Sequence, residues 1–326
     1  MSYGTDGFLA VSRQSSWGTA TTSWHFMPFV SEGIVTNKEL LMQESILDRY
    51  DEPAPVEGLE TVEGDISFEL NPIDCGPFLH AACGSVAVTT TLSGKVWTHE
   101  FTLTQDRFDG NAALTPYGFQ IYRGVEQAFQ LTDGQVNTLE INIAAGGIVK
   151  MNVGIMSRTT SLMQAGTASY FNAEAFTWDQ ASFSLTAAGS TAAVVSDFEE
   201  ITISLNNALS GIVLLDGTKR RGRIQRDGYR EVRVSGTIDL PDLDEYDIFM
   251  AQTERKLLTT LTKATAMSSG YYENMVIDIP SFRYEAFPIN VGGPGRITVG
   301  FTGRGIYNSG SACTMKITLV NTKSAY

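Results

Sequence analysis

Residues that could perform acid–base or nucleophilic chemistry are sparse in this chain. Its 326 residues include three histidines and three cysteines: His25, His80, His99, Cys75, Cys83 and Cys313. The motifs GxSxG, HExxH, GxxxxGK[ST] and DxDxDG, which mark four familiar kinds of catalytic or ion-binding site, are all missing. We therefore predict that the chain is not an enzyme. A β-sandwich hydrolase, with a catalytic triad assembled from distant residues, stays as an alternative.

Cys75, His80 and Cys83 lie close together in the sequence and could be read as metal ligands. Their spacing matches no common zinc pattern, and a fourth ligand is not evident. Free cysteine is among the residue types most often buried. We interpret these three as packing residues and expect no cofactor. An odd, small number of cysteines also argues against a disulfide framework and favours a reducing cytosol.

Two charged loops offer a different kind of binding chemistry. Residues 32–63 are mostly acidic, and residues 216–233 are mostly basic. Where two copies of the chain meet, such loops would face complementary charge, which sets orientation more than affinity. We predict an inter-subunit interface formed by these charged residues: Glu39, Glu44, Asp48, Arg49, Asp51, Glu52, Lys219, Arg220, Arg221, Arg223, Arg226 and Arg230.

The basic loop could also bind phosphate, and four tryptophans could stack on sugars. The net charge of −13 opposes tight binding to nucleic acid, and only Tyr229 offers an aromatic platform in the basic loop. We expect DNA only as a cargo that passes by. A receptor- or carbohydrate-binding module stays as an alternative, based on Trp17, Trp24, Trp97 and Trp178.

The composition is that of a globular protein, with 43% hydrophobic and 18% charged residues. No apolar run of about 18 residues exists, so we expect no membrane span. The first residues lack the basic start and apolar core of a secretory signal. The many glycines among short apolar runs indicate strands separated by turns.

Most segments alternate apolar and polar residues with the period of a β-strand, so one face of each strand is expected in a core. Strands are predicted at Asp65–Leu70, Leu139–Ile143, Val149–Ile155, Glu200–Leu205, Val232–Leu240 and Arg296–Phe301. Two helices are expected to interrupt them. One runs from Pro72 to about Cys83, with proline at its start and Gly84 after its end. The other runs from about Leu243 to Leu261, with acidic residues in its first turn.

The two halves of the chain are similar in sequence. Residues 143–158 align without a gap on residues 289–304, and residues 62–66 match residues 234–238 in the same order. The first half carries an insertion near residues 89–116. We predict a mainly β fold of two tandem β-barrels or sandwiches, each with a short flanking helix. Residues 1–158 form the first, and residues 159–326 form a connection and the second. Independent Gly-Gly hairpins stay as an alternative.

Several segments, in their order along nearly the whole chain, resemble the long tail tube proteins of bacteriophages with long tails. They are Gly18-Thr19, Phe26–Gly33, Ile46–Arg49, Val62–Pro72, His99–Phe101, Gly134–Ile141 and Glu200–Leu209. The resemblance implies β-barrels in rings that stack into a hollow tube for genome ejection. Some members with a duplicated barrel form rings of three chains that imitate six-fold rings, so we favour a trimeric pseudo-hexamer over a hexamer.

The same resemblance implies partners and a location. The partners are other copies of the chain and the tape measure, tail terminator and distal tail proteins, with no membrane involved. The location is the virion, after assembly in the cytoplasm of the host bacterium. In this setting the binding-module alternative becomes a receptor or carbohydrate module at the tail tip.

Overall fold

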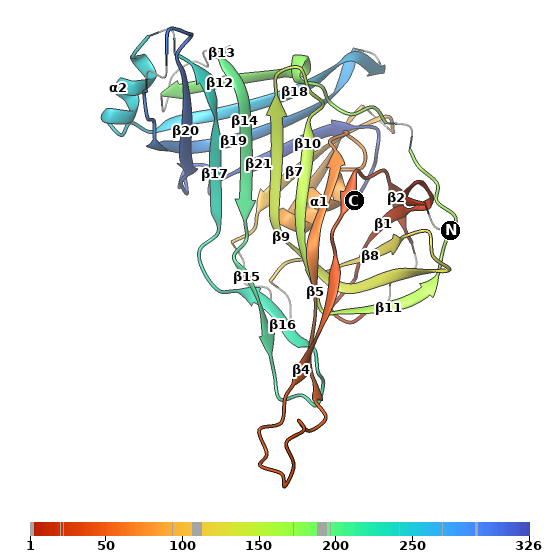
Figure 1. The fold of residues 1–326 in the computed structure, drawn as a ribbon. Coiled ribbons are helices and arrows are strands. Elements are labelled where there is room, and N and C mark those ends of the chain that lie inside the picture. The colour runs from red at the N-terminus through yellow and green to blue at the C-terminus, as the bar shows by residue number, and fades with distance from the viewer. Residues whose placement is uncertain are drawn as a thin grey trace.

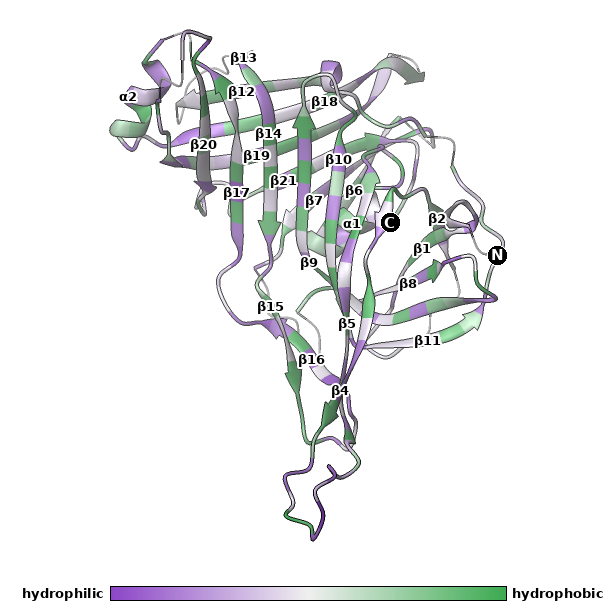
Figure 2. Ribbon diagram, viewed as in Figure 1, coloured by the Kyte–Doolittle hydropathy of each residue, from purple (hydrophilic) through white to green (hydrophobic). Residues whose placement is uncertain are grey.

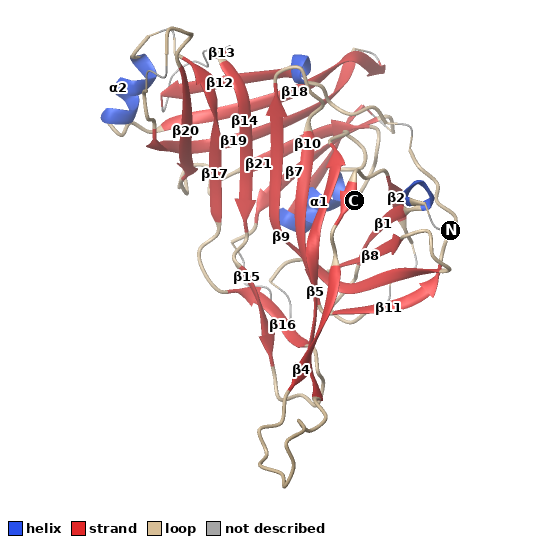
Figure 3. Cartoon of the chain, viewed as in Figure 1, coloured by secondary structure: helices blue, strands red, loops and turns tan. Residues whose placement is uncertain are grey.

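The computed structural model describes residues 3–19, 21, 23–92, 94–105, 113–171, 173–187, 194–195, 197–240, 242–268, 270–290 and 293–326. Strands dominate this part of the chain, with two short α-helices and two 3-10 turns at Gly4–Asp6 and Trp178–Gln180 (Figure 3). The prediction of a mainly β fold is confirmed. Within the described residues, neither helix has the length and apolarity that crossing a bilayer requires.

Six antiparallel strands from both halves lie side by side in one layer, which we call the front sheet (Figure 1). In spatial order they are β5 (Val56–Glu69), β10 (Lys150–Ser157), β9 (Gln127–Ala144), β14 (Phe198–Asn206), β17 (Glu231–Asp239) and β20 (Thr298–Gly305). Side chains alternate along each strand, so that Ile66, Val153 and Ile203 enter the core while their neighbours face outward. This alternation is visible as bands of hydropathy in Figure 2.

A second layer packs behind the front sheet. Its strands in the first half are β1 (Phe8–Arg13), β2 (His25–Met27), β8 (Tyr117–Tyr122) and β11 (Thr159–Gln164). Those in the second half are β12 (Ala181–Ala187), β13 (Val194–Val195), β18 (Arg255–Ser268), β19 (Tyr271–Ala286) and β21 (Lys316–Asn321). The long strands β9 and β19 pair in both layers and so link them, β9 with β8, β11 and β10, and β19 with β18, β21 and β20.

The order of strand pairing repeats between the halves. In the first half β1 pairs with β2 and β8, while in the second half β12 pairs with β13 and β18. The register repeats as well, because Gly64 lies opposite Ile155 in β5·β10 and Gly236 lies opposite Phe301 in β17·β20. These are the positions that the sequence alignment equates. The division of the chain into two barrels stays a prediction.

Both predicted helices are shorter than expected. Helix α1 spans Gly76–Cys83, because the residues before it form a turn in which Asn71 Oδ1 accepts hydrogen bonds from the amides of Ile73 and Asp74. Helix α2 spans only Asp244–Met250. The prediction of a helix to Leu261 is wrong, since β18 begins at Arg255 and buries alternate side chains between β12 and β19.

The insertion and the connection contain strands. β6 (Gly84–Leu92) pairs with β7 (Val96–Leu103), and β7 pairs with β21 of the second half. Residues 106–112 of the predicted insertion, residues 188–193 of the connection and Gly292 of the second Gly-Gly turn lie outside the described residues. The start of the connection is β11, which pairs with β9 and thus extends the sheet of the first half.

The two charged segments are hairpins rather than open loops, which corrects that prediction. Residues 32–63 hold the end of β3 (Ser31–Glu32), then β4 (Val35–Leu41), an irregular tip and most of β5. Residues 216–233 hold β16 (Arg221–Arg226), which pairs with β15 (Leu209–Val213), and the start of β17. Figure 1 shows both hairpins projecting together from the lower end of the front sheet. We call this projection the arm.

Candidate assembly surfaces

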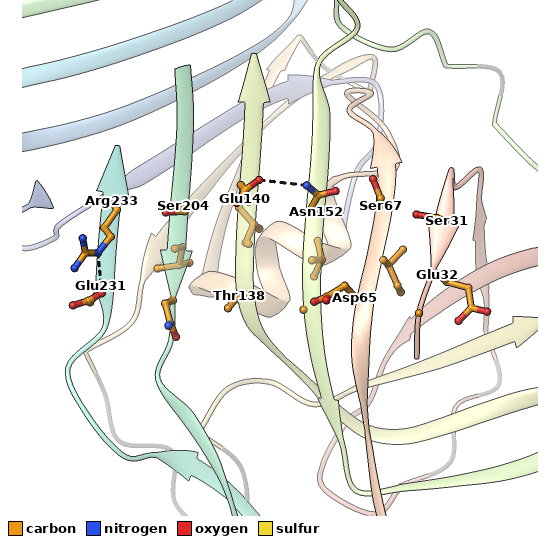
Figure 4. Close-up of a pocket in the computed structure, with 17 residues that line it drawn as sticks. Ser31, Glu32, Asp65, Ser67, Thr138, Glu140, Asn152, Ser204, Glu231 and Arg233 are labelled. Atoms are coloured by element: carbon orange, nitrogen blue, oxygen red, sulfur yellow. Dashed lines mark hydrogen bonds and ion pairs between the residues drawn. The ribbon is translucent and has the colours of Figure 1, made fainter. Parts of the chain in front are cut away.

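The outward side of the front sheet, which we call the polar face, carries small polar and acidic side chains. A concavity of about 900 Å³ lies on it, lined by residues of β3, β5, β10, β9, β14 and β17 (Figure 4). The outward residues alternate with core residues, so the same pattern that builds the core also builds this face. Carboxylates and small polar groups predominate around its centre: Glu32, Asp65, Ser67, Thr138, Glu140, Asn152 and Ser204.

Charge is distributed unevenly over the polar face. At the β17 and β20 side, Arg233 bonds Glu231 and Glu285, each at 3.1 Å, and Arg304 bonds the same two carboxylates at 3.0 and 2.9 Å. This network neutralises that side, and the hydrogen bond from Arg233 lowers the pKa of Glu231. Asp65 on β5 and Glu140 on β9 are outward carboxylates of the first half, and Asp65 is exposed. The face is therefore more acidic toward the first half.

The two hairpins of the arm hold each other within one chain. Lys219 Nζ lies 3.2 Å from Glu57 Oε2, and the Lys219 carbonyl accepts a hydrogen bond of 2.8 Å from the Glu60 amide. Arg221 Nη2 lies 2.5 Å from Glu63 Oε2, and its Nη1 donates to the carbonyls of Val62 and Ser157. The predicted complementarity between acidic and basic segments is thus used, in part, inside the chain.

The predicted interface residues lie in three different settings in the structure. Lys219 and Arg221 bind acidic residues of the first half in the same chain. Arg226 and Arg230 lie at the root of the arm, beside a second cavity of about 1100 Å³. Burial lowers the pKa of both, to about 10 for Arg230. The remaining members are exposed on the arm: Glu39, Glu44, Asp48, Arg49, Asp51, Glu52, Arg220 and Arg223.

Removing the side chain of Arg221, the buried arginine of the arm, should lower the stability of the chain. We expect Arg221→Met to destabilise the chain by about 1–3 kcal/mol, because the Arg221 side chain is only 7% exposed and the Glu63 side chain keeps partial contact with water. Denaturant unfolding would measure the loss. Arg220→Met, on the exposed neighbouring residue, is the control and should stay within about 0.5 kcal/mol of the unaltered chain. Equal stability of the two variants would contradict the idea that the Arg221 contacts stabilise the arm.

The arm also exposes large apolar side chains. Ile46, Tyr50 and Leu215 are fully exposed, and Leu40, Met42 and Val213 are at least half exposed. A projecting element that combines apolar and charged groups is typical of a protein–protein contact rather than of a surface that stays in water. The arm therefore has the character of a docking element.

The two halves of the chain are joined through strand edges. β14 of the second half pairs with β9 of the first half over the full length from Glu200 to Asn206. The front sheet thus crosses the boundary between the halves without a break (Figure 1). On the first-half side β3 and β4 pair with β5, and among the described residues they pair with no other strand. A free strand edge of this kind is a template for another chain.

The titratable residues in and directly before helix α1 serve packing. Cys75, His80 and Cys83 are all buried, and His80 Nδ1 lies 2.7 Å from the Tyr117 hydroxyl oxygen. Burial raises the pKa of Cys83 to about 12 and lowers that of His80 to about 4, so thiol and imidazole are both uncharged near neutral pH. Within the described residues, no group of three or more His, Cys, Asp or Glu side chains is arranged to hold a metal ion.

A comparison with known protein families gives a match over nearly the whole chain. A family model described as phage tail tube protein matches residues 4–305. The matched range includes the front sheet, the arm and the edge at β3 and β4. A comparison with curated proteins gives no match.

Proposed function

Because the chain belongs to the phage tail tube protein family, we propose that it polymerises into stacked rings that form the tail tube and conduct the genome out of the particle. Membership makes the chain a structural component of the virion that associates with itself and with other tail proteins. Tape measure, tail terminator and distal tail proteins are the proposed neighbours. Assembly is proposed to take place in the host cytoplasm.

The observation that carries this proposal is the joint between β9 and β14 within one chain. The equivalent registers of β5·β10 and β17·β20 support a repeat of one β unit, and β9·β14 joins two such units edge to edge. A similar joint between chains would continue the sheet from the second half of one chain to the first half of the next. Three chains would then supply six units and close a ring, leaving no free edge.

In such a ring we propose that the polar face lines the channel. Asp65, Glu140 and Glu200 lie among small hydroxyl and amide side chains there, and Asn142 Nδ2 donates to Glu200 Oε1 at 2.7 Å. Carboxylates repel the phosphates of DNA, and short side chains leave little for bases to grip. The DNA would therefore pass without being retained.

We propose that the arm contacts the neighbouring ring in the stack. Its acidic tip holds Glu44, Asp48, Asp51 and Glu52, whereas Arg220 and Arg223 project from the other hairpin. Within the described residues, no ion pair engages these two arginines. Opposite charges on one projecting element favour contacts with a second copy in a fixed orientation.

Reversing the exposed arginines of the arm should weaken polymerisation. We expect Arg220→Glu with Arg223→Glu to raise the concentration needed for tube formation about tenfold or more, because several screened pairs per ring are reversed. Arg221 is left unaltered because its buried contacts hold the arm together. Arg13→Glu with Lys95→Glu, on exposed residues outside the arm, is the control with the same change in net charge. Sedimentation and negative-stain electron microscopy measure the outcome, and normal tubes from the arm variant would contradict this role of the arm.

The proposed function itself is tested by expressing the chain alone and imaging it. Hollow cylinders with a regular axial repeat are the expected result, and image averaging should show three chains per ring with six similar units. Rings of six chains would overturn the trimeric arrangement while keeping the tube. A chain that stays monomeric at all concentrations would argue against self-assembly as its function.

A further inference from the structure

At the free edge of β3 and β4, the backbone amide and carbonyl of Ile34 are covered by side chains. Glu32 Oε2 accepts a hydrogen bond of 3.1 Å from the Ile34 amide, and Arg123 Nη2 donates one of 2.5 Å to the Ile34 carbonyl. Arg123 also grips Glu32 through two hydrogen bonds of 2.7 and 2.9 Å. The amide and the carbonyl of Ile34, which we call its edge groups, are thus both hydrogen-bonded to the Glu32–Arg123 ion pair.

Ile34 has a counterpart in the second half. Gly64 and Gly236, which occupy matching registers, each lie so close to the adjacent strand that a side chain would clash with it. An added Cβ would approach the carbonyl oxygen of one residue to 2.3 Å and also meet the next Cα. At Gly64 the added Cβ would meet the carbonyl oxygen of Gly33 and the Cα of Ile34. At Gly236 it would meet the carbonyl oxygen of Glu200 and the Cα of Ile201. The close approach therefore equates Ile34 with Ile201.

The edge groups of Ile201 face β9. Ile201 lies opposite Ile143 in the β9·β14 ladder. At the two ends of this ladder, the Ala145 amide donates to the Glu199 carbonyl and the Asn207 amide donates to the Asn137 carbonyl. Backbone direction alternates along a strand, so the odd-numbered residues of β14 point their polar groups at β9. The atoms that Glu32 and Arg123 cover on Ile34 thus correspond to atoms that form the joint between the halves.

We propose that Glu32 and Arg123 form a removable cap on the edge that receives a second copy of this chain. The inference rests on the proposed ring assembly, and it adds a feature that limits which strand pairs with the edge. An uncovered edge can pair with any exposed strand, and charged side chains on edges reduce such pairing. The cap satisfies Ile34 in the free chain, and it opens when a strand of the correct partner takes its place.

The partner segment is identified by the same repeat. In the first half, β9 continues beyond its contact with β8 and β11 and offers its edge to β14. In the second half, β19 ends at Ala286, and residues 287–290 run on without pairing as a strand. Phe287 is buried, and Ile289 packs against the core, so this segment is held beside the front sheet. It is the counterpart that would receive the Ile34 edge of the next chain.

The cap is built to be displaced at low cost. The side chain of Arg123 is 36% exposed, and ion pairs with such access to water contribute little to stability. Its guanidinium also lies 4.7 Å from the centre of the Phe129 ring, a surface on which it can remain after releasing Ile34. Several ladder hydrogen bonds from an incoming strand outweigh one such pair.

Removing the cap should speed assembly rather than slow it. We expect Arg123→Ala and Glu32→Ala, which remove the donor and the acceptor of the cap, to start polymerising about tenfold faster than the unaltered chain at equal concentration, as followed by light scattering. Glu100→Gln with Lys316→Gln, which removes an exposed pair between β7 and β21, is the control and should leave the rate unchanged. Slower or unaltered assembly of both cap variants would overturn the proposal.

A swapped pair separates the cap from the ion pair. Glu32→Arg with Arg123→Glu keeps opposite charges, but an arginine cannot accept from the Ile34 amide and a carboxylate cannot donate to the Ile34 carbonyl. We expect this variant to assemble as fast as the single variants. A rate equal to that of the unaltered chain would show that the ion pair alone matters and would overturn the cap.

Hydrogen exchange locates the joint directly. The Ile34 amide should exchange faster in the unassembled Glu32→Ala chain than in the unaltered chain, because alanine cannot accept its hydrogen bond, and it should become strongly protected in tubes. Unchanged exchange in the variant, or tubes without protection at Ile34, would place the joint elsewhere. If the unaltered chain forms no rings, the proposed function fails. If it forms rings that the cap variants do not accelerate, only the cap fails.

Discussion

Replacement of Gly64 by alanine is expected to destabilise the chain by about 3–5 kcal/mol, through overpacking and backbone strain together. Gly64 has a φ of +155°, and an added Cβ would lie 2.3 Å from the Gly33 carbonyl oxygen and 2.6 Å from the Ile34 Cα. Both contacts are with backbone atoms, so no side-chain rotation can relieve them. Urea unfolding at neutral pH measures the loss.

Two further glycines sharpen this prediction. Gly236→Ala should cost a similar amount, because its Cβ would also lie 2.3 Å from a carbonyl oxygen, that of Glu200. Gly300→Ala on β20 is the control, since no atom lies within 4 Å of the added Cβ, and its cost should be below about 1 kcal/mol. Stable folding of Gly64→Ala would contradict the close approach of β5 to the edge strand.

The stability of the chain should fall on acidification because of His80. Burial lowers the pKa of His80 to about 4 in the folded chain, whereas the ordinary value for histidine is about 6.5. Between these values the unfolded chain takes up a proton at His80 that the folded chain does not. This contribution to stability is therefore present above pH 6.5 and is lost as the pH falls toward 4, by about 3 kcal/mol in total.

His80→Asn isolates this effect from the titration of carboxylates. Asparagine can accept from the Tyr117 hydroxyl, which lies 2.7 Å from His80 Nδ1, but it does not titrate. We expect the variant to be less stable at pH 7.5 because it loses ring packing. The difference in unfolding free energy between the two proteins should shrink steadily from pH 6.5 to pH 4. A constant difference would show that His80 gains its proton equally in both states.

Period-two alternation predicted much of the front sheet from sequence. The six predicted strands lie within or over β5, β9, β10, β14, β17 and β20, because each exposes one face and buries the other. The alternation does not say which edges meet. That Ile141 of β9 lies opposite Ile203 of β14 follows from long-range packing, which no local pattern encodes.

The error in the second helix has a local cause. The acidic residues before Tyr246 are good helix starters and do begin α2, but Gln252 adopts a φ of +51° shortly after the helix ends. Downstream, Leu257, Thr259 and Leu261 are all buried, with less buried residues between them. That alternation was the signal for a strand, and leucine and lysine, which also favour helices, obscured it.

The charged segments were found from composition, but their partners were not. Lys219 and Arg221 bind carboxylates of the first half in the same chain, and a sequence cannot distinguish this from contact between chains. The cap was missed altogether. Glu32 belongs to the Phe26–Gly33 segment and to the acidic segment, but Arg123 lies 91 positions away and in neither, so only the folded edge brings the two together.

The in-chain pairing of β9 with β14 has a consequence for how fast a ring can close. A six-unit ring built from single-unit subunits needs five encounters between free molecules before its last seam closes. Here alternate seams would already exist when each polypeptide has folded, so only two such encounters and one closing contact would remain. Each encounter between free molecules costs several kcal/mol of lost translational and rotational freedom. Fusing units in pairs would therefore favour complete circles over stalled open arcs at low protein concentration.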